Sequence, residues 1–286
     1  ERTDYANGYK PKQLNTRLGK LFLDIPQVRN GDFYPNALER GTRTEKSLKI
    51  SIAEMYLQGV STRKVTKVME SLCGFEVSSA QVSEATQQLD PVFEAWRERP
   101  LGRFPHLIAD ALYEKVRENG KVIPNAVLIV YGIDSEGKRC VLGLSISTSE
   151  AEIHWRTFFQ SLVQRGLHGV ETVTSDAHKG LRAAIQTVFP GIEWQRCQFH
   201  LQQNAQKFVP RIDMREMVAE QIRQIFNAGK RREADRLLDE ALSEWSKTAP
   251  KLAAWAEENI PEGLAVMNWD KRKWKKLRTS NLAERV

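Results

Sequence analysis

The sequence predicts an α/β protein in which a mixed sheet is followed by a long helical segment. Three observations predict this fold. Residues 104–210 hold short apolar runs of strand length that alternate, in their second half, with helical patterns. Residues 211–270 show helical periodicity alone, and residues 45–98 show short helices separated by glycine-containing turns. Helices that alternate with strands indicate a sheet with covered faces.

The N-terminal 44 residues are polar and basic and contain one strand-like stretch. Leu21, Leu23 and Ile25 alternate with their neighbours, which predicts a strand over 18–26. We expect Pro26 to end this strand or to place it at a sheet edge.

Three short helices are predicted next. Ser61 or Thr62 can cap the second and Ser78 or Ser79 the third. A helix-turn-helix unit and a small helical bundle fit this pattern equally well. The expected helices are 45–57, 62–72 and 79–89.

The sheet follows. Its first three strands are joined by short polar loops, as in an antiparallel meander, and two later strands alternate with helices. The order β-β-β-α-β-α-β-α is the ribonuclease-H-like pattern, a mixed sheet with helices on both faces. The expected strands are 107–112, 123–133, 139–146, 170–174 and 192–196, and the expected helices are 150–165, 178–188 and 199–209.

The segment 211–270 is predicted to be an all-helical insertion. Spaced apolar positions and charged outer faces mark three helices, and Gly229, Pro250 and Pro261 separate them. The expected helices are 214–227, 230–245 and 252–258.

Charge, cysteine spacing and the lengths of the apolar runs indicate which partners and which location to expect. The 286-residue chain carries 43 Lys and Arg against 36 Asp and Glu, a net charge of +7, which favours a polyanionic partner such as nucleic acid. The three cysteines have no framework spacing, as expected in a reducing cytosol. No apolar run approaches the roughly 20 residues that span a bilayer. Because residue 1 is a glutamate, we expect the chain to be part of a longer protein.

Three acidic residues are candidates for catalysis. Asp110 interrupts the apolar run of the first strand of the sheet, Asp176 follows the fourth strand, and Glu284 follows a dense basic run. Carboxylates are the ligands that Mg²⁺ prefers, and two such ions can cleave a phosphodiester. The alternatives are an N-cap role for Asp176 and a solvated position for Glu284. An unpaired Asp110 in a buried strand is costly, which favours a functional role.

Cys197 and His200 form a Cys-x-x-His pair at the end of the fifth strand. A zinc site needs four ligands, and no second pair of suitable spacing is present, so we expect a structural role for both. His178 lies two residues after Asp176, and it is either a neighbour of the active site or a surface histidine.

Basic residues cluster in two places. The run 271–278 contains a tryptophan and directly precedes Glu284, and the second predicted helix carries three cations. Cations contact phosphates and indoles stack on bases, so we expect DNA contacts here, with a solvated charged face as the alternative. The candidates are Arg63, Lys64, Lys67, Lys271, Arg272, Lys273, Trp274, Lys275, Lys276, Arg278 and Arg285.

Several motifs resemble those of the Mutator-type DDE transposase family of bacterial insertion sequences. The resemblance covers nearly the whole chain and includes Gly59-Val-Ser-Thr-Arg-Lys-Val65. The most specific motifs are Ser175-Asp-Ala-His-Lys-Gly-Leu181, Trp194-Gln-Arg-Cys-Gln-Phe-His200 and Thr279-Ser-Asn-Leu-Ala-Glu-Arg285.

The resemblance implies a catalytic domain of ribonuclease-H-like fold with Asp110, Asp176 and Glu284 as its metal-binding acids. It implies two Mg²⁺ (or Mn²⁺) ions per active site, double-stranded terminal inverted repeats and target DNA as partners, a homodimer, and a location on the bacterial nucleoid in the cytoplasm. The implied activity is DNA cleavage followed by 3′-OH strand transfer. An inert DNA-binding protein of the same descent and a nuclease without strand transfer are the alternatives.

We accordingly expect five parts in the chain. They are a basic segment with a short strand, a helical region for DNA binding or dimerisation, the catalytic core, the helical insertion, and a return to the core with the last acid. Their expected ranges are 1–44, 45–102, 103–210, 211–270 and 271–286.

Overall fold

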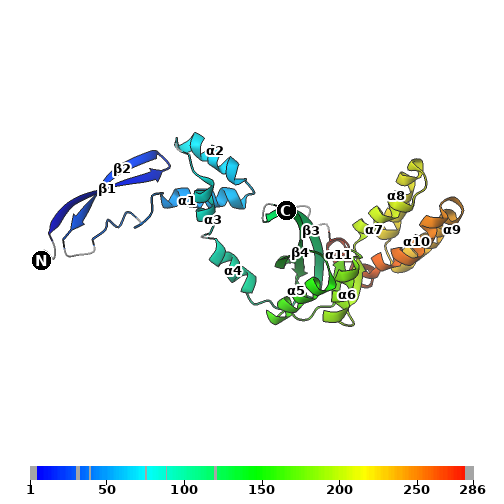
Figure 1. Cartoon of the computed structure of the whole chain (residues 1–286). Helices are drawn as coiled ribbons and strands as arrows, with labels where there is room; N and C mark the ends of the chain where they lie inside the picture. The colour runs from blue at the N-terminus through cyan, green and yellow to red at the C-terminus, as the bar shows by residue number, and fades with distance from the viewer. Residues whose placement is uncertain are drawn as a thin grey trace. The chain divides into compact units, whose positions relative to one another are not determined.

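The computed structural model describes residues 5–29, 33–38, 40–74, 76–87, 89–118 and 121–280. The chain divides into two compact units, Glu1–Trp96 and Arg97–Val286 (Figure 1). Each unit has its own elements and its own core, and each is described by itself.

The first unit begins with a β-hairpin. β1 (Ala6–Thr16) and β2 (Gly19–Val28) pair antiparallel. The predicted strand 18–26 is β2, whereas β1 was not predicted, because its mostly exposed side chains show no alternation of apolar and polar residues. β2 continues through Pro26, so of the two expected outcomes the edge position, and not the end of the strand, is the one observed. In a two-stranded sheet every strand is an edge strand, and the position without an N–H can face away from its partner.

Three helices of the first unit confirm the three predicted ones. They are α1 (Lys46–Leu57), α2 (Thr62–Cys73) and α3 (Ser79–Gln87). The hydroxyl of Ser61 caps α2 by accepting the Lys64 N–H at 3.4 Å. The three helices share one apolar core, which contains Leu48, Ile52, Val65, Met69, Cys73, Val77, Val82 and Ala85.

A further helix, α4 (Asp90–Glu98), was not predicted. It has no buried residue among those described, although its apolar side chains repeat at helical spacing. Its apolar residues Val92 and Phe93 are exposed.

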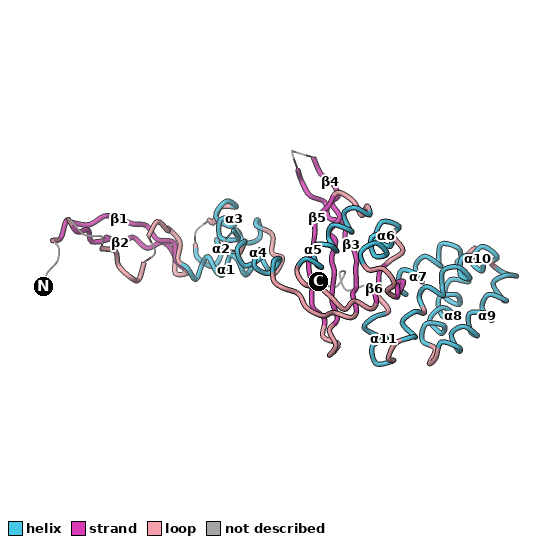
Figure 2. Tube along the Cα trace, turned by 90° about the horizontal axis from the view of Figure 1, so that it is seen from below, coloured by secondary structure: helices cyan, strands magenta, loops and turns pink. Residues whose placement is uncertain are grey.

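The second unit contains a five-stranded mixed sheet in the order β5-β4-β3-β6-β7. Figure 2 shows strands of this sheet in magenta, with helices in cyan beside them. β3 (His106–Glu118), β4 (Lys121–Ile133) and β5 (Arg139–Ser147) form the expected antiparallel meander. β6 (Thr172–Ser175) and β7 (Glu193–Arg196) run parallel to β3. β3 extends six residues past the predicted end at 112, because it stays paired with β4 as far as Glu118.

Helices cover both faces of this sheet, as predicted. Alternate residues of a strand point to opposite faces, so Leu107 and Ala109 join one core while Ile108 joins the other. The Leu107 face packs against α5 (Glu152–Gln164) and α6 (Lys179–Val188). The Ile108 face shares its core with α7 (Gln198–Ala205) and with the helices that follow.

The segment after α7 is helical in every described element, as predicted. Its helices are α8 (Arg215–Asn227), α9 (Arg231–Thr248), α10 (Pro250–Asn259) and α11 (Lys271–Leu277). Trp245 anchors α9 in the core with no exposed surface, and its indole N–H donates to Gln221 at 2.9 Å. Among the helices of the described residues, none has the length and apolarity to cross a membrane.

Candidate active site beside two parallel strands

Asp110 is the fifth residue of β3, which is a central strand of the sheet. It lies on the same face as Ile108, the face that the later helices cover. Burial raises the pKa of the Asp110 carboxyl to about 7; a hydrogen bond from the Ala111 N–H opposes this rise, and the charge of Asp176 adds to it. The Ala111 N–H lies 3.0 Å from Asp110 Oδ1. A carboxyl group with this pKa is partly protonated near neutral pH, and a bound cation would favour its ionised form.

Asp176 directly follows β6, the strand that pairs with β3, and β3 carries Asp110. The parallel register pairs Ile108 with Thr174. Asp110 and Asp176 each follow this last pair by two residues, and the charge of Asp176 acts on the Asp110 carboxyl. The prediction that β3 and β6 are neighbouring strands is confirmed by this pairing, and the role of the two acids stays a prediction.

The alternative role of Asp176 as a helix cap is not what the structure shows. His178 occupies the N-cap position of α6 and makes no side-chain cap hydrogen bond. Asp176 Oδ1 instead accepts the His178 N–H at 3.0 Å, in a turn that precedes the helix. Among the described residues none donates a hydrogen bond to Asp176 Oδ2, so this oxygen is available to a ligand.

Glu150 is a third carboxylate beside the pair, and sequence reasoning missed it. Its side chain is 11% exposed, in the segment between β5 and α5, and burial raises its pKa. Its Oε2 lies 4.0 Å from His178 Nδ1, so His178 is a neighbour of the acidic site, although its side chain is 43% exposed. Asp176 raises the pKa of Glu150 further, which places these carboxylates within electrostatic reach.

Gly180 is what allows this arrangement. A Cβ at Gly180 would overlap the backbone carbonyl of Glu150 and would lie 2.8 Å from the Glu152 N. The first turn of α6 therefore packs directly on the backbone that carries Glu150. The glycine in the Asp-Ala-His-Lys-Gly stretch was the one sequence signal of such a close approach.

The described chain returns to the site at Ser280, which is fully buried. The Ser280 hydroxyl lies beside Asp110 and lowers its pKa, yet it has no aligned hydrogen-bond partner among the described atoms. Glu284 and Arg285, predicted as the last acid and as a DNA contact, lie outside the described residues.

The donor set fits a divalent cation in part. Asp110, Asp176 and the unpartnered Ser280 hydroxyl offer hard oxygen atoms, which suit Mg²⁺ or Mn²⁺ rather than softer metals. Within the described ranges no group of three or more His, Cys, Asp or Glu side chains is arranged to hold a metal.

Cys197 and His200 take part in no metal cluster of the described chain. Cys197 is fully buried at the N-cap of α7, and its sulfur accepts the Ser280 N–H at 3.3 Å. The His200 ring packs edge-on against Phe199, with a centroid distance of 5.5 Å.

Most of the basic run in and after α11 is engaged within the protein. Lys276 donates to the Gly137 carbonyl at 2.7 Å, Arg272 pairs with Asp270, and Arg278 donates to Asn227 at 2.9 Å. Trp274 donates to the Trp269 carbonyl at 2.8 Å. For Lys271 the structure shows a cation–π contact with Trp274, and Lys275 is exposed.

Lys273 contacts a buried histidine. Its ammonium lies 3.3 Å from His106 Nε2, and burial, reinforced by the Lys273 charge, lowers the pKa of His106 to about 4. His106 is therefore neutral, and its Nε2 can accept a hydrogen bond from the Lys273 ammonium. A cavity of about 300 Å³ opens here between α11 and the loop of Ser135, Glu136 and Gly137.

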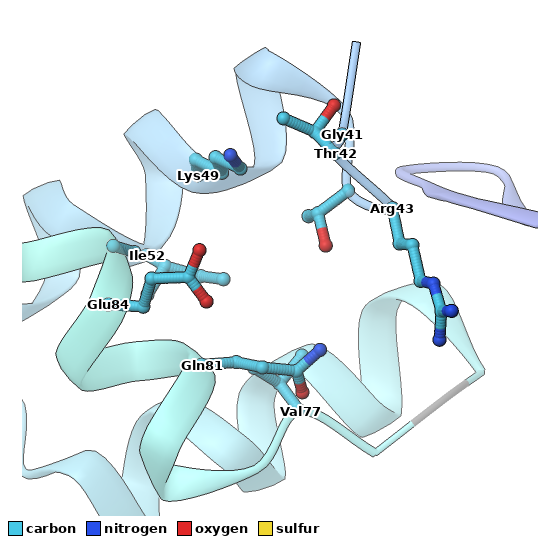
Figure 3. Close-up of a pocket in the computed structure, with 10 residues that line it drawn as sticks. Gly41, Thr42, Arg43, Lys49, Ile52, Val77, Gln81 and Glu84 are labelled. Carbon is cyan, nitrogen blue, oxygen red and sulfur yellow. The ribbon is translucent and has the colours of Figure 1, made fainter. Parts of the chain in front are cut away.

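In the first unit, Arg63, Lys64 and Lys67 are exposed on α2. A cavity of about 240 Å³ lies in the same unit, between the segment 41–44 and helices α1 and α3. Figure 3 shows Lys49 from α1 and Gln81 and Glu84 from α3 around it. None of the candidate acids contributes to this cavity.

Fold and site together define an α/β protein with an acidic site beside two parallel strands of a mixed sheet. The chain belongs to the Mutator family of transposases, whose family model matches residues 1–286. It is 54% identical over its whole length to the transposase for insertion sequence element IS406 of Burkholderia multivorans, covering 74% of that protein.

Two further relatives carry similar descriptions. The chain is 41% identical over its whole length to the transposase for ISRM5 of Rhizobium meliloti and covers 72% of it. Over 73% of the chain it is 45% identical to the transposase for IS256 in transposon Tn4001 of Staphylococcus aureus, covering 54% of that protein. The family resemblance predicted from the motifs is thereby confirmed.

Proposed function

We propose that this chain is the DNA-cleaving and strand-transferring part of an insertion-sequence transposase, with a ribonuclease-H-like catalytic core. Asp110, Asp176 and Glu284 bind the catalytic Mg²⁺ or Mn²⁺ ions, two per active site. The observation that carries the proposal is that β3, which carries Asp110, pairs with β6, which Asp176 directly follows, and that the charge of Asp176 acts on Asp110. The names of the relatives support the same activity.

The sheet topology supports the proposed fold. Three antiparallel strands followed by two parallel ones, with helices on both faces, match the order expected of a ribonuclease-H-like core. In that arrangement the first and fourth strands of the sheet are neighbours, as β3 and β6 are here.

The chemistry needs few protein groups. Bound divalent ions would supply activation of a water or 3′ hydroxyl and stabilisation of the departing 3′ oxygen. Asp110 and Asp176 would hold these ions. Burial is the main cause of the raised pKa of Asp110, and the charge of Asp176 adds to it.

The third proposed ligand is within reach of the pair. Glu284 follows Ser280 by four residues, and four residues span at most about 14 Å. Since Ser280 lies beside Asp110, the length of the chain permits Glu284 to complete the ligand set.

The proposed partners are the double-stranded terminal inverted repeats and the target DNA, on the nucleoid, with a second copy of the chain in a homodimer. The exposed cations of α2 support a DNA contact in the first unit. In α11 the structure favours Lys271 and Lys275, because the other cations of the run are bonded within the protein.

The test uses labelled terminal-repeat DNA with Mg²⁺ or Mn²⁺. We expect nicking and joining by the parent protein, and none by Asp176→Ala, which should still bind the DNA. The matched control is Asp239→Ala, because Asp239 is an exposed acid of α9, and it should cleave normally.

Each other outcome points to a different function. Normal cleavage by the Asp176→Ala variant would contradict the assignment of the site. Binding without cleavage by the parent protein would favour an inert DNA-binding role, and cleavage without joining would favour a nuclease.

A further inference from the structure

The chain that leaves α11 is held against the two parallel strands by three hydrogen bonds. Thr174 Oγ1 of β6 donates to the Leu277 carbonyl at 2.5 Å. The Gln198 N–H, at the start of α7, donates to the Arg278 carbonyl at 2.9 Å. The Ser280 N–H donates to Cys197 Sγ at 3.3 Å. We call residues 277–280 the return segment.

These bonds lie in the protein interior. Thr174, Cys197 and Ser280 have no exposed surface, and Leu277 and Gln198 are 2% and 4% exposed. Water cannot take the place of a partner that is lost there, so each bond constrains the return segment more than a surface bond would.

Within the described residues, the hydrogen bond from the Ser280 N–H is the one role that the structure gives the Cys197 sulfur. Cys197 is a free cysteine, and it belongs to no metal-binding group of the described residues. It occupies the N-cap of α7, but its side chain does not cap the helix. Its contact with the Ser280 N–H joins positions 83 residues apart in the sequence.

The last of the three bonds lies next to the acidic site. Ser280, whose amide is bound by Cys197, is the residue whose hydroxyl lies beside Asp110. A shift of the Ser280 backbone would therefore move this hydroxyl relative to Asp110.

We propose that Cys197 is a positioning residue for the catalytic site: its sulfur accepts the Ser280 amide and thereby fixes the return segment that leads to the third acid. This inference rests on the proposed function, because the position of the segment affects cleavage only if the acids bind the catalytic ions. It assigns Cys197 of the Cys-x-x-His pair a structural role that does not require zinc.

The proposal makes the hydrogen-bond acceptor, and not the volume of the side chain, the property that matters. Serine keeps an acceptor at this position, whereas valine fills the space without one. Cys197→Ser should therefore retain the function that Cys197→Val loses. Cys73→Val is the matched control, because Cys73 is a buried thiol in the core of the first unit.

The primary measurement is amide hydrogen exchange of the peptide that contains Ser280, in the full chain without DNA. We expect Cys197→Val to speed exchange there by about 5- to 30-fold, with Cys197→Ser and Cys73→Val unchanged. Metal-dependent cleavage should fall by a similar factor in Cys197→Val alone, through kcat rather than through DNA affinity.

Unchanged exchange at Ser280 in Cys197→Val would overturn the proposal, as would bound zinc that is lost in Cys197→Ser. If Cys197→Val does not fold, Cys197→Ala provides the same comparison. If the parent protein fails to cleave DNA, the proposed function fails, while the exchange result still decides whether Cys197 holds the return segment.

Discussion

Asp110 shows how a functional residue can oppose the stability of its own fold. Its carboxyl is raised to a pKa of about 7 by burial and by the neighbouring Asp176. The ionised group is therefore unfavourable in the folded, metal-free protein. This cost to folding supports the proposal that Asp110 binds a ligand.

Replacing Asp110 should stabilise the metal-free protein. Because the folded pKa lies above the unfolded value of 3.8, the parent loses stability as pH rises from about 4 to about 7, and then no further. We expect Asp110→Asn to abolish cleavage and to gain roughly 2 kcal/mol at pH 8, with a much smaller gain at pH 4. Thermal melts in a chelator across this range measure the difference. An equal gain at both pH values would contradict the assigned pKa.

Glu150 is expected to matter for activity more than for folding. It is a buried carboxylate within electrostatic reach of Asp176 and close to His178. Glu150→Gln keeps the size of the side chain and removes its charge, so the melting temperature should hold or rise while cleavage falls about tenfold or more. Steady-state cleavage rates with the exposed Glu240→Gln as control measure this effect, and unchanged cleavage would remove Glu150 from the site.

At the scale of elements, the site depends on how closely α6 approaches the start of α5. The close contact at Gly180 sets the distance between the segment that carries Asp176 and the segment that carries Glu150. A small change in this packing should therefore disturb both carboxylates.

Gly180→Ala tests that contact. The added methyl group would overlap the backbone at Glu150, so we expect a loss of about 2–4 kcal/mol in the free energy of unfolding and a loss of cleavage. Gly102→Ala is the control, because a Cβ there meets nothing within 4 Å. Denaturant titration compares the two variants, and equal stability would mean that α6 shifts without cost.

The cations of α11 differ in whether they are bonded to other described groups of the protein, as Lys276 is, or are exposed without such a bond, as Lys275 is. We expect the double change Lys271→Ala and Lys275→Ala to weaken DNA binding without a change in melting temperature. The slope of the logarithm of the binding constant against the logarithm of the salt concentration should fall by up to about two. Lys276→Ala removes a bond to the Gly137 carbonyl and should affect mainly stability. Binding titrations at several salt concentrations distinguish the two sets, and equal effects would contradict this division.

At the scale of the whole molecule, each unit carries its own core. The helices α1 to α3 enclose one core, and the sheet with its two layers of helices encloses two more. The fragment 97–286 should therefore fold alone, with a melting transition within a few degrees of that in the full chain. Calorimetry of the fragment and of the full chain tests this independence, and an unfolded fragment would refute it.

Much of this fold could be predicted because its signals are local. The apolar runs of the five strands and the caps at Ser61 and Gly74 act within a few residues. β1 escaped prediction because its described side chains are mostly exposed and show no alternation. α4 was not predicted as a separate helix, although its apolar side chains repeat at helical spacing. The length of β3 depended on its pairing with β4, which is a tertiary fact.

The sequence by itself determined the five strands of the mixed sheet, the family, and the fact that the strand of Asp110 and the strand before Asp176 are neighbours, because the chain order already indicates this topology. Only the tertiary structure showed Glu150 beside that pair, the Cys197 sulfur on the Ser280 amide, and the internal bonds of α11. The physical reason is distance along the chain. Periodicity and capping reflect neighbours a few residues away, whereas these contacts join segments brought together only by packing on the two faces of the sheet.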